Sequence, residues 1–273
     1  MAFSSGPAYH DRAMSTPHKK PAWVIEKERA RRSGPEPVWL FGLHAVRDAL
    51  ANPKRRIDRL VVTRNAAEKL RDAIDARGVA PEEANPRKFP VALDPGSVHQ
   101  GAALLTPPLD WGDAEEICAP TAADPNPIVV LLDRVTDPHN VGAILRSAEV
   151  FGARAVIAPL RHAAPETGAL AKSASGALER QPYIRVKNLA SEMERLRTIG
   201  YRLVGLDGEA NVDLGAALAA GPIGLVLGAE GPGLREKTKE TCDAIAKIPF
   251  ATDFGSLNVS NAAAVALYAA AQR

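Results

Sequence analysis

Short apolar runs separated by polar segments begin near Pro37. They predict strands at 38–41, 60–63 and 102–106, and apolar residues spaced at helical intervals predict a helix after the first and after the second of these strands. Gly78 follows the second helical pattern, and glycine commonly ends a helix. Together these elements predict a small α/β unit.

The second half of the chain alternates strand-like and helix-like segments more regularly. This alternation predicts an α/β fold with a parallel sheet that helices cover on both faces. Ligands bind beyond the carboxyl ends of the strands in such sheets, so we expect chemistry in the loops after Leu132 and Leu227. The predicted strands are 128–132, 155–158, 202–206 and 223–227, and the predicted helices are 141–151, 166–175 and 189–198.

A proline-rich stretch separates these two regions. Residues 107–127 hold five prolines and several acidic residues, a composition typical of a linker with room for one helical turn. The chain has 273 residues, more than the usual size of one domain. We therefore expect a tail at 1–35, a small domain at 36–107, a linker at 108–127 and a larger domain at 128–273.

Composition narrows the class of protein. Hydrophobic residues make up 46% of the chain and charged residues 24%, as in ordinary globular proteins. No apolar stretch is long enough to span a bilayer, so we expect a soluble protein without a membrane partner. Cys118 and Cys242 have neither metal-ligand spacing nor a disulfide framework, which suits a reducing compartment and two small buried side chains.

The first 35 residues are basic and rich in proline and serine. They hold seven Lys or Arg against three Asp or Glu, a net charge of +4, although the whole chain carries only +2. Because this segment has no periodic apolar face, we expect it to be disordered and interpret it as a basic arm for RNA phosphates. A mitochondrial transit peptide is the alternative, which Asp11, Glu26 and Glu28 disfavour.

The loop after Leu132 leads into a helix that carries Asn140 and Arg146. Asn140 suits the N-cap of this helix, because asparagine is favoured there. Arg146 has two interpretations. It is either a surface residue paired with Glu149, three positions later, or part of a functional site at the end of a buried strand.

The loop after Leu227 holds three glycines within six residues, Gly228, Gly231 and Gly233, around the single carboxylate of Glu230. Glycines in such a loop let the backbone approach a ligand closely. The loop matches neither the dinucleotide fingerprint G-x-G-x-x-G nor a phosphate-binding loop, which needs a following Lys-Ser or Lys-Thr. The missing fingerprint excludes a nicotinamide-dependent dehydrogenase, which the α/β alternation alone would allow.

A polar cluster stands directly before the Ala-rich apolar run that ends the chain. Its members are Ser256, Asn258, Ser260 and Asn261. Serine and asparagine commonly cap helices, and the start of a helix also gathers unsatisfied N–H groups and partial positive charge. Capping and ligand binding are therefore both consistent with this junction.

Three ordered segments, 131–157, 224–236 and 248–268, resemble the motifs of the SpoU, or TrmH-type, RNA ribose methyltransferases of the SPOUT superfamily. Two N-terminal pieces, 41–46 and 98–101, resemble the subgroup that methylates a guanosine ribose in the peptidyl-transferase region of 23S rRNA. The resemblance covers the whole chain except the basic tail.

The resemblance implies a fold and a cofactor. The C-terminal segment of these enzymes is threaded through a loop, forming a deep trefoil knot around the S-adenosylmethionine site, and their small N-terminal α/β domain is ribosomal-protein-L30e-like and binds RNA. At the matching positions Leu227, Gly228, Ile248 and Leu257 would hold the cofactor, the glycine by admitting close approach and apolar side chains by walling the adenine. A homodimer that packs through the knots, with an arginine borrowed from the partner chain, and a bacterial cytoplasmic location are also implied.

The implied reaction is methyl transfer to a ribose 2′-hydroxyl, which needs no metal but does need an aligned and partly deprotonated hydroxyl. By resemblance, Arg146 takes or steers the hydroxyl proton, while Asn140, Glu230, Ser256 and Asn258 position Arg146 and the nucleotide. Because a free guanidinium stays protonated, we favour an orienting and electrostatic role for Arg146.

The substrate is expected to be RNA, because the 2′-hydroxyl distinguishes RNA from DNA. The subgroup implies a guanosine of 23S rRNA, alone or in a ribosome assembly intermediate. The alternatives are tRNA, another rRNA nucleotide, or an RNA-binding relative without catalysis. His44, His99 and Gln100 of the small domain either touch RNA or serve packing and capping.

Two places depart from the family pattern. Phe250, Asp253 and Phe254 stand in a stretch where relatives commonly have Met followed by small residues and Gly, so we expect an altered cofactor loop. Asn261 stands where many relatives carry an apolar residue, and it either touches substrate or caps the helix.

Overall fold

A computed structural model defines most of the chain. Residues Pro37–Arg273 form one compact unit. Nearly all of the basic tail, and with it the predicted arm for RNA, lies outside the described residues, as do Asp253 and Phe254 of the altered cofactor loop. The described residues are 1, 35–91, 93, 97–251 and 256–273.

The first part of this unit is a four-stranded sheet with two helices. Its elements are β1 (Val38–Phe41), α2 (Leu43–Ala51), β2 (Arg59–Val62), α3 (Arg64–Arg77), β3 (Glu82–Glu83) and β4 (Ala102–Thr106). The strand order is β1-β4-β2-β3, and β4 pairs antiparallel with both β1 and β2. Leu40, Val62 and Leu104 pack with α2 and α3 in one apolar core. The three predicted strands and two predicted helices are confirmed, and β3 is an addition.

Local sequence accounts for both ends of α3. The Thr63 side chain accepts a hydrogen bond from the Ala66 N–H at the start. Gly78 ends the helix with φ at +68°, a conformation that glycine adopts without steric cost. The predicted end of this helix is therefore confirmed, and glycine ends it as the sequence indicated.

The proline-rich segment contains one short helix, α4 (Ala114–Cys118). Its N-cap is Asp113, whose carboxylate accepts a hydrogen bond from the Glu115 N–H at 2.9 Å. This helix is the single helical turn that the composition of the linker allowed.

The rest of the unit contains a seven-stranded sheet. Its strands are β5 (Ile128–Asp133), β6 (Ala155–Pro159), β7 (Tyr183–Val186), β8 (Arg202–Leu206), β9 (Val212–Asp213), β10 (Ile223–Gly228) and β11 (Ala244–Lys247). Their order is β7-β6-β5-β10-β8-β11-β9, and every pairing is parallel, which confirms the predicted parallel sheet. The pattern missed β7, β9 and β11 because two to four residues carry little periodic signal.

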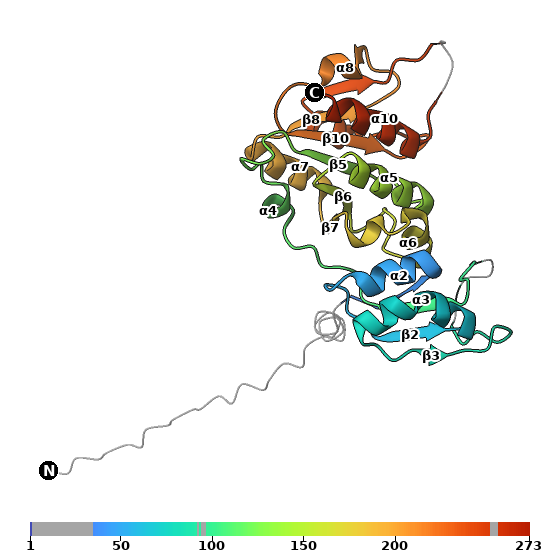
Figure 1. The fold of residues 1–273 in the computed structure, drawn as a ribbon. Helices are drawn as coiled ribbons and strands as arrows, with labels where there is room; N and C mark the ends of the chain where they lie inside the picture. The colour runs from blue at the N-terminus through green and yellow to red at the C-terminus, as the bar shows by residue number, and fades with distance from the viewer. Residues whose placement is uncertain (2–34, 92, 94–96, 252–255) are drawn as a thin grey trace. The chain divides into compact units, whose positions relative to one another are not determined.

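Helices cover both faces of the larger sheet, as predicted. They are α5 (Pro138–Val150), α6 (Gly168–Ala174), η1 (Ala177–Glu179), α7 (Leu189–Thr198), α8 (Leu214–Ala217), α9 (Glu236–Thr241) and α10 (Val259–Ala271). Along β5, Val130 and Leu132 join a core with α5, α6 and α10, whereas Val129 and Leu131 join a second core with α4 and α7. α5 and α10 lie side by side over β5 and β10 (Figure 1).

α5 begins earlier than predicted. Its N-cap is Asp137, whose carboxylate accepts a hydrogen bond from the His139 N–H at 2.9 Å, and Pro138 occupies the first turn. The prediction that Asn140 is the N-cap is therefore wrong. An aspartate cap followed by proline starts a helix efficiently, and it leaves the Asn140 side chain available for other partners.

α10 also begins earlier than the predicted Ala-rich run. Asn258 is its N-cap and accepts a hydrogen bond from the Ser260 N–H. Ser260 and Asn261 therefore lie in the first turn, and Asn261 is not the cap. The capping interpretation of the polar junction is confirmed at Asn258.

Neither cysteine is poised for chemistry. Cys118 is buried and Cys242 half-buried, and both are unpaired thiols. Burial raises the pKa of each thiol to about 12, so neither is a thiolate near neutral pH. Among the described residues, no helix is long and apolar enough to cross a bilayer.

Gly142 tests the packing of α5 on α6. Alanine normally stabilises a helix interior by about 0.5–1 kcal/mol relative to glycine. At Gly142, however, a Cβ would lie 2.6 Å from the Ser173 Cβ and 2.8 Å from the Ala174 nitrogen. We predict that Gly142→Ala lowers the free energy of unfolding by about 1–3 kcal/mol, measured by urea denaturation.

Gly215→Ala in α8 is the matched control, because a Cβ there meets nothing within 4 Å. It should be neutral or stabilising. An unfolding free energy for Gly142→Ala at or above that of the parent would contradict the close helix contact.

Candidate functional site

Three segments far apart in the sequence meet beyond the carboxyl ends of β5 and β10. The Asn140 side-chain amide donates to Glu230 Oε1 at 3.1 Å. The Asn258 amide donates to the same oxygen at 2.5 Å and to Asn140 Oδ1 at 3.0 Å. We call these three side chains the Asn140–Glu230–Asn258 triangle. The triangle joins the first turn of α5, the glycine-rich loop and the start of α10.

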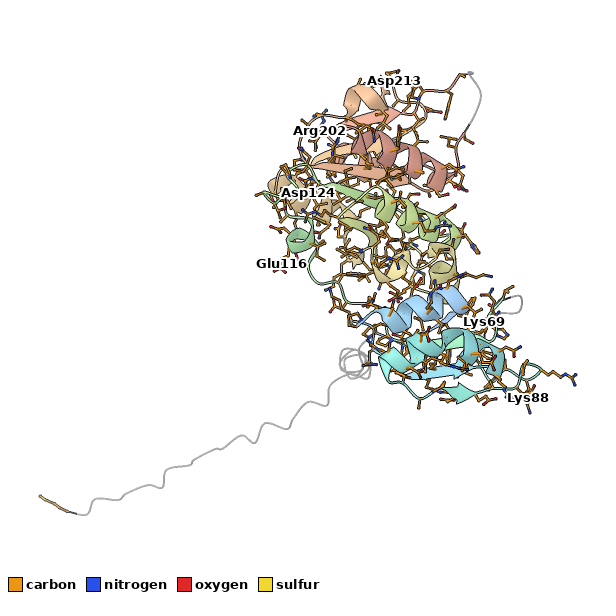
Figure 2. All side chains as sticks on the ribbon, viewed as in Figure 1. Lys69, Lys88, Glu116, Asp124, Arg202 and Asp213 are labelled. Atoms are coloured by element: carbon orange, nitrogen blue, oxygen red, sulfur yellow. The ribbon has the colours of Figure 1, made fainter. Side chains whose placement is uncertain are left out.

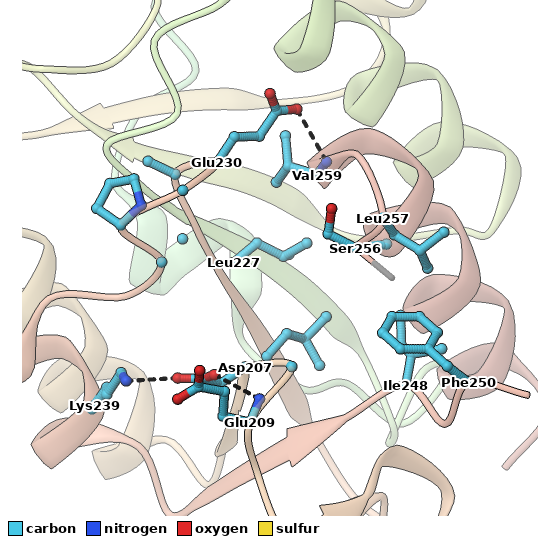
Figure 3. Close-up of a pocket in the computed structure, with 18 residues that line it drawn as sticks. Asp207, Glu209, Leu227, Glu230, Lys239, Ile248, Phe250, Ser256, Leu257 and Val259 are labelled. Carbon is cyan, nitrogen blue, oxygen red and sulfur yellow. Dashed lines mark hydrogen bonds and ion pairs between the residues drawn. The ribbon is translucent and has the colours of Figure 1, made fainter. Parts of the chain in front are cut away.

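The triangle also caps α10. The Val259 N–H donates to Glu230 Oε1 at 3.4 Å (Figure 3). Asn258 Oδ1 accepts from the Ser260 N–H at 2.9 Å and from the Ser260 hydroxyl at 2.5 Å. A carboxylate at the start of a helix is favoured by the partial positive charge there. Capping and site formation therefore use the same hydrogen bonds, and the two interpretations of this junction do not compete.

A cavity of about 400 Å³ opens beside Glu230 (Figure 3). Its lining includes all four residues expected to hold the cofactor: Leu227, Gly228, Ile248 and Leu257. Glu230 and Ser256, from the expected catalytic set, also line it. Asn140, Asn258 and Arg146 are not part of the lining.

Phe250, one of the residues that depart from the family pattern, lines the cavity beside Ile248 (Figure 3). The departure therefore adds an aromatic ring to the apolar side of the cavity. Its effect on the rest of the loop falls outside the described residues.

Sequence reasoning missed a charged group in the cavity. Lys239 Nζ lies 2.6 Å from Asp207 Oδ2, and this interaction lowers the pKa of Asp207. Glu209 lies beside them (Figure 3). Asp207 and Glu209 follow β8, which pairs with β10, so the rule that led to the loops after β5 and β10 would also have found them. Lys239 lies in α9, and no sequence pattern indicated that it would line the cavity.

Gly228 is required by the packing of its own loop. The Gly233 N–H donates to the Ala229 carbonyl at 2.9 Å, which folds the loop back on itself. A Cβ on Gly228 would then lie 2.2 Å from the Gly233 carbonyl carbon. This packing excludes a side chain at Gly228 whether or not a ligand approaches.

A buried carboxylate holds the far end of the glycine-rich loop. Asp133, the last residue of β5, is fully buried. It accepts hydrogen bonds from the Arg235 N–H at 3.0 Å, from Arg235 Nε at 2.7 Å and from the Thr238 hydroxyl at 2.7 Å. Charge-assisted bonds of this kind are among the stronger ones in proteins. The loop is therefore held at Glu230 on one side and at Arg235 on the other.

Arg146 is exposed on α5. The surface pair with Glu149 is not formed, because Glu149 instead binds Arg180, with Oε2 3.2 Å from Nη2. Within the described part of the chain, Arg146 has no hydrogen-bond or ion-pair partner. The structure does not bring Arg146 into contact with the triangle, but it leaves the guanidinium available to an external group.

The three candidate RNA-binding residues of the small sheet are placed differently. Gln100 Oε1 accepts a hydrogen bond from the Leu43 N–H at 3.1 Å and thus serves the start of α2. The His99 ring stacks on Phe89 at a centroid distance of 4.2 Å, and its Nδ1 accepts from the Gly101 N–H. His44 is exposed. Two of the three therefore have packing or capping roles.

Residues 127–268 match the model of the SpoU rRNA Methylase family, just over half of the chain. The chain belongs to the SpoU rRNA methylase family. Residues 39–111 match a second model, described as RNA 2′-O ribose methyltransferase substrate binding. The family resemblance of the three motifs is thereby confirmed.

Individual relatives extend this similarity over most of the chain. The chain is 39% identical to the 23S rRNA (guanosine-2′-O-)-methyltransferase RlmB of Photobacterium profundum, covering 86% of this chain and 97% of the relative. It is 36% identical to the RlmB of Escherichia coli K12, covering 86% and 98%. The SpoU methyltransferase AviRb from Streptomyces viridochromogenes, solved with AdoMet, has a TM-score of 0.74 and 26% identity, covering 90% of this chain and 92% of AviRb.

These findings make the chain an S-adenosylmethionine-dependent RNA 2′-O-methyltransferase of the SpoU family. The cavity fits this cofactor in size, because ligand sites commonly measure about 300–1,000 Å³. Its apolar lining, including Leu227, Ile248 and Leu257, suits an adenine ring. The Asp207–Lys239 pair adds polar groups suited to the hydroxyl and charged parts of the molecule.

Gly228 provides a test of the cavity wall. We predict that Gly228→Ala displaces the 229–233 loop and weakens S-adenosylmethionine binding by about tenfold or more, which is at least ~1.4 kcal/mol by calorimetry. Gly215→Ala is the control, because a Cβ there meets nothing within 4 Å and Gly215 lies outside the cavity lining. Equal affinities in the two variants would show that the loop tolerates a side chain at Gly228.

Proposed function

We propose that this SpoU methyltransferase transfers the methyl group to the ribose 2′-hydroxyl of a guanosine in 23S rRNA. One observation carries the proposal: the Asn140–Glu230–Asn258 triangle joins the three family motifs beside the cavity that is lined by the expected cofactor-binding residues. The named substrate of the RlmB relatives, which are 36–39% identical over 86% of the chain, supports the choice of RNA and nucleotide.

When bound, S-adenosylmethionine supplies a methyl group on an activated sulfonium. The chain must therefore align the ribose oxygen and ease the loss of its proton. Ser256 lines the same cavity as Glu230, and its hydroxyl is suited to hydrogen-bond the ribose. The triangle keeps Glu230, the glycine-rich loop and the start of α10 in one fixed arrangement, so the nucleotide meets a preorganised surface.

Arg146 acts as an orienting and electrostatic group. A guanidinium stays protonated in proteins, so it stabilises the negative charge that develops on the 2′-oxygen and directs the departing proton to solvent or to a phosphate oxygen. Its lack of partners within the described residues supports this role, because the side chain is not already committed to an internal ion pair.

Two alternatives have different support. A tRNA or another rRNA nucleotide would use the same catalytic groups, so only the substrate separates these enzymes. A non-catalytic RNA-binding relative is disfavoured, because the triangle is intact and Ser256 lines the cavity.

The proposal includes the deep trefoil knot and the ribosomal-protein-L30e-like fold of the small unit. Support for the knot comes from two facts: β10 lies between β5 and β8, and α10 returns after β11 to pack against α5 and β10. An experimental chain trace that stays entangled when both termini are pulled outward would test it, and the same structure would test the small fold.

The proposal also includes a homodimer. An exposed apolar patch supports it: Val150 is 76% exposed, Tyr268 56% and Val265 42%, and the Tyr268 ring packs edge-on against Phe151 at 6.0 Å. Val265 and Tyr268 belong to α10, Val150 is the last residue of α5, and Phe151 is the C-cap of α5. Sedimentation should give twice the 28.9 kDa chain mass for the parent and a smaller mass for Val265→Asp.

Arg146→Lys tests the mechanism. Lysine keeps the positive charge but loses the planar set of donors, so we predict a fall in kcat of about 100-fold. Calorimetry should show S-adenosylmethionine affinity within about twofold of the parent, because Arg146 does not line the cavity. Arg197→Lys, on α7, is the control and should leave kcat unchanged. Near-parental turnover of Arg146→Lys would remove Arg146 from the mechanism.

The substrate is tested by mapping. The purified protein is incubated with labelled S-adenosylmethionine and, separately, with 23S rRNA fragments or with tRNA. We expect label only in the 23S RNA, at one guanosine. Deleting the gene should leave that nucleotide unmethylated in cellular rRNA. Label in tRNA, or at a different 23S nucleotide, would select the alternative substrates.

A further inference from the structure

A buried arginine links the small sheet to the part of the chain that carries the site. Arg55 lies between α2 and β2, and its side chain is 0% exposed. Its guanidinium donates to Glu179 Oε2 at 3.0 Å and Oε1 at 2.6 Å, and to Glu166 Oε1 at 2.5 Å. It also donates to the Pro107 carbonyl at 3.1 Å. All of these acceptors follow the small sheet in the sequence.

The carboxylates of Glu166 and Glu179 accept further hydrogen bonds besides those from Arg55. Glu166 also accepts from the Leu109 N–H at 3.2 Å, and Glu179 Oε2 also accepts from the Asn52 amide at 2.9 Å. Both glutamates are buried, and burial raises the pKa of Glu166. A buried cation shared by two buried carboxylates is favourable only at a narrow set of distances and angles. The cluster therefore fixes geometry more strongly than a surface ion pair would.

Close packing at two glycines reinforces this contact. A Cβ on Gly168 would lie 2.3 Å from the Phe41 ring and 2.5 Å from the Trp39 carbonyl oxygen. A Cβ on Gly176 would lie 2.0 Å from Asp48 Oδ2. The Trp39 backbone cannot move aside, so α6 approaches β1 too closely for a larger residue at Gly168. At Gly176 the close atom is the end of the Asp48 side chain, and glycine is favoured there by its φ of +88°.

The contact continues from α6 to α5, which carries Asn140 and Arg146. The Ser173 hydroxyl donates to the His139 carbonyl at 3.0 Å. Because Gly142 has no side chain, α5 packs so closely on α6 that Ser173 and its neighbours lie where a Cβ of residue 142 would make contact. An unbroken series of tight contacts therefore runs from Arg55 and the small sheet to the helix of the catalytic residues.

We propose that Arg55 is a positioning residue that locks the small N-terminal sheet to α6 and η1, so that RNA held by this sheet is presented to the Asn140–Glu230–Asn258 triangle in one register. The proposal rests on the proposed RNA methylation. Displacing a reacting group by about 1 Å can cost 100-fold in rate, so a loosened contact should reduce kcat more than RNA binding.

The first test is a distance measurement on the whole chain without RNA. Spin labels on Lys69→Cys and Asp213→Cys, in a Cys242→Ser background, report the separation of the two regions; both labelled positions are exposed (Figure 2). The parent should give a single narrow distance distribution. A broad or two-peaked distribution in the parent overturns the proposal whether or not any variant folds.

The second test uses two variants that disturb the contact in different ways. Arg55→Lys keeps the charge but cannot serve two carboxylates and a carbonyl in one plane, and Gly168→Ala inserts a methyl group against Phe41. Each should broaden the distance distribution and lower kcat on the RNA that the parent methylates by about tenfold or more. KM for RNA and the S-adenosylmethionine dissociation constant should stay within about threefold of the parent.

Arg195→Lys is the matched control. Arg195 also binds three carboxylates, those of Asp113, Glu115 and Glu192, but it is exposed and lies on α7. It should leave distances and kcat unchanged. Broadened distances with parental kcat in Arg55→Lys would overturn the proposal, as would a lowered kcat with parental distances. If Arg55→Lys loses S-adenosylmethionine binding sites because it unfolds, the same two outcomes in Gly168→Ala decide. Failure of the parent to methylate 23S RNA would instead count against the proposed function, since the distance measurement needs no RNA.

Discussion

The carboxylate of Glu230 at the start of α10 is the interaction on which the site depends. One oxygen accepts from Asn140, from Asn258 and from the Val259 N–H. A negative charge is stabilised there by the helix terminus, so the arrangement is favourable before any ligand binds. Because the donors come from three separate segments, this oxygen determines how α5, the glycine-rich loop and α10 stand relative to one another.

The cavity exists because the glycine-rich loop is held on both sides. Asp133 binds Arg235 and Thr238 at one end, and the triangle binds Glu230 at the other. Between them the loop turns back so tightly that only glycine fits at 228. The parallel sheet provides the base for this construction, since β5 and β10 are neighbours and both end at the same edge.

The small sheet and the methyltransferase sheet have separate strands but share a buried ionic contact at Arg55. Buried ion clusters contribute little net stability compared with well-packed apolar groups, but they tolerate few alternative geometries. In an enzyme that must bring a nucleotide within a large RNA to one methyl group, a fixed spacing between recognition and chemistry has a direct use. The tight contact of Gly168 with the Trp39 backbone serves the same purpose.

The sequence by itself determined the parallel sheet, most helices, the two loops to search and the three family motifs, because hydrophobic periodicity and short motifs depend on residues close together in the chain. Tertiary structure decided what those residues do. Asn140 is not the N-cap of α5 and instead binds Glu230, 90 residues away. Arg55 has no sequence signal, because its carboxylates lie 111 and 124 residues further on. Lys239 enters the cavity only through the placement of α9. Local pattern has a range of a few residues, whereas hydrogen bonds and burial form between whichever segments the fold brings together.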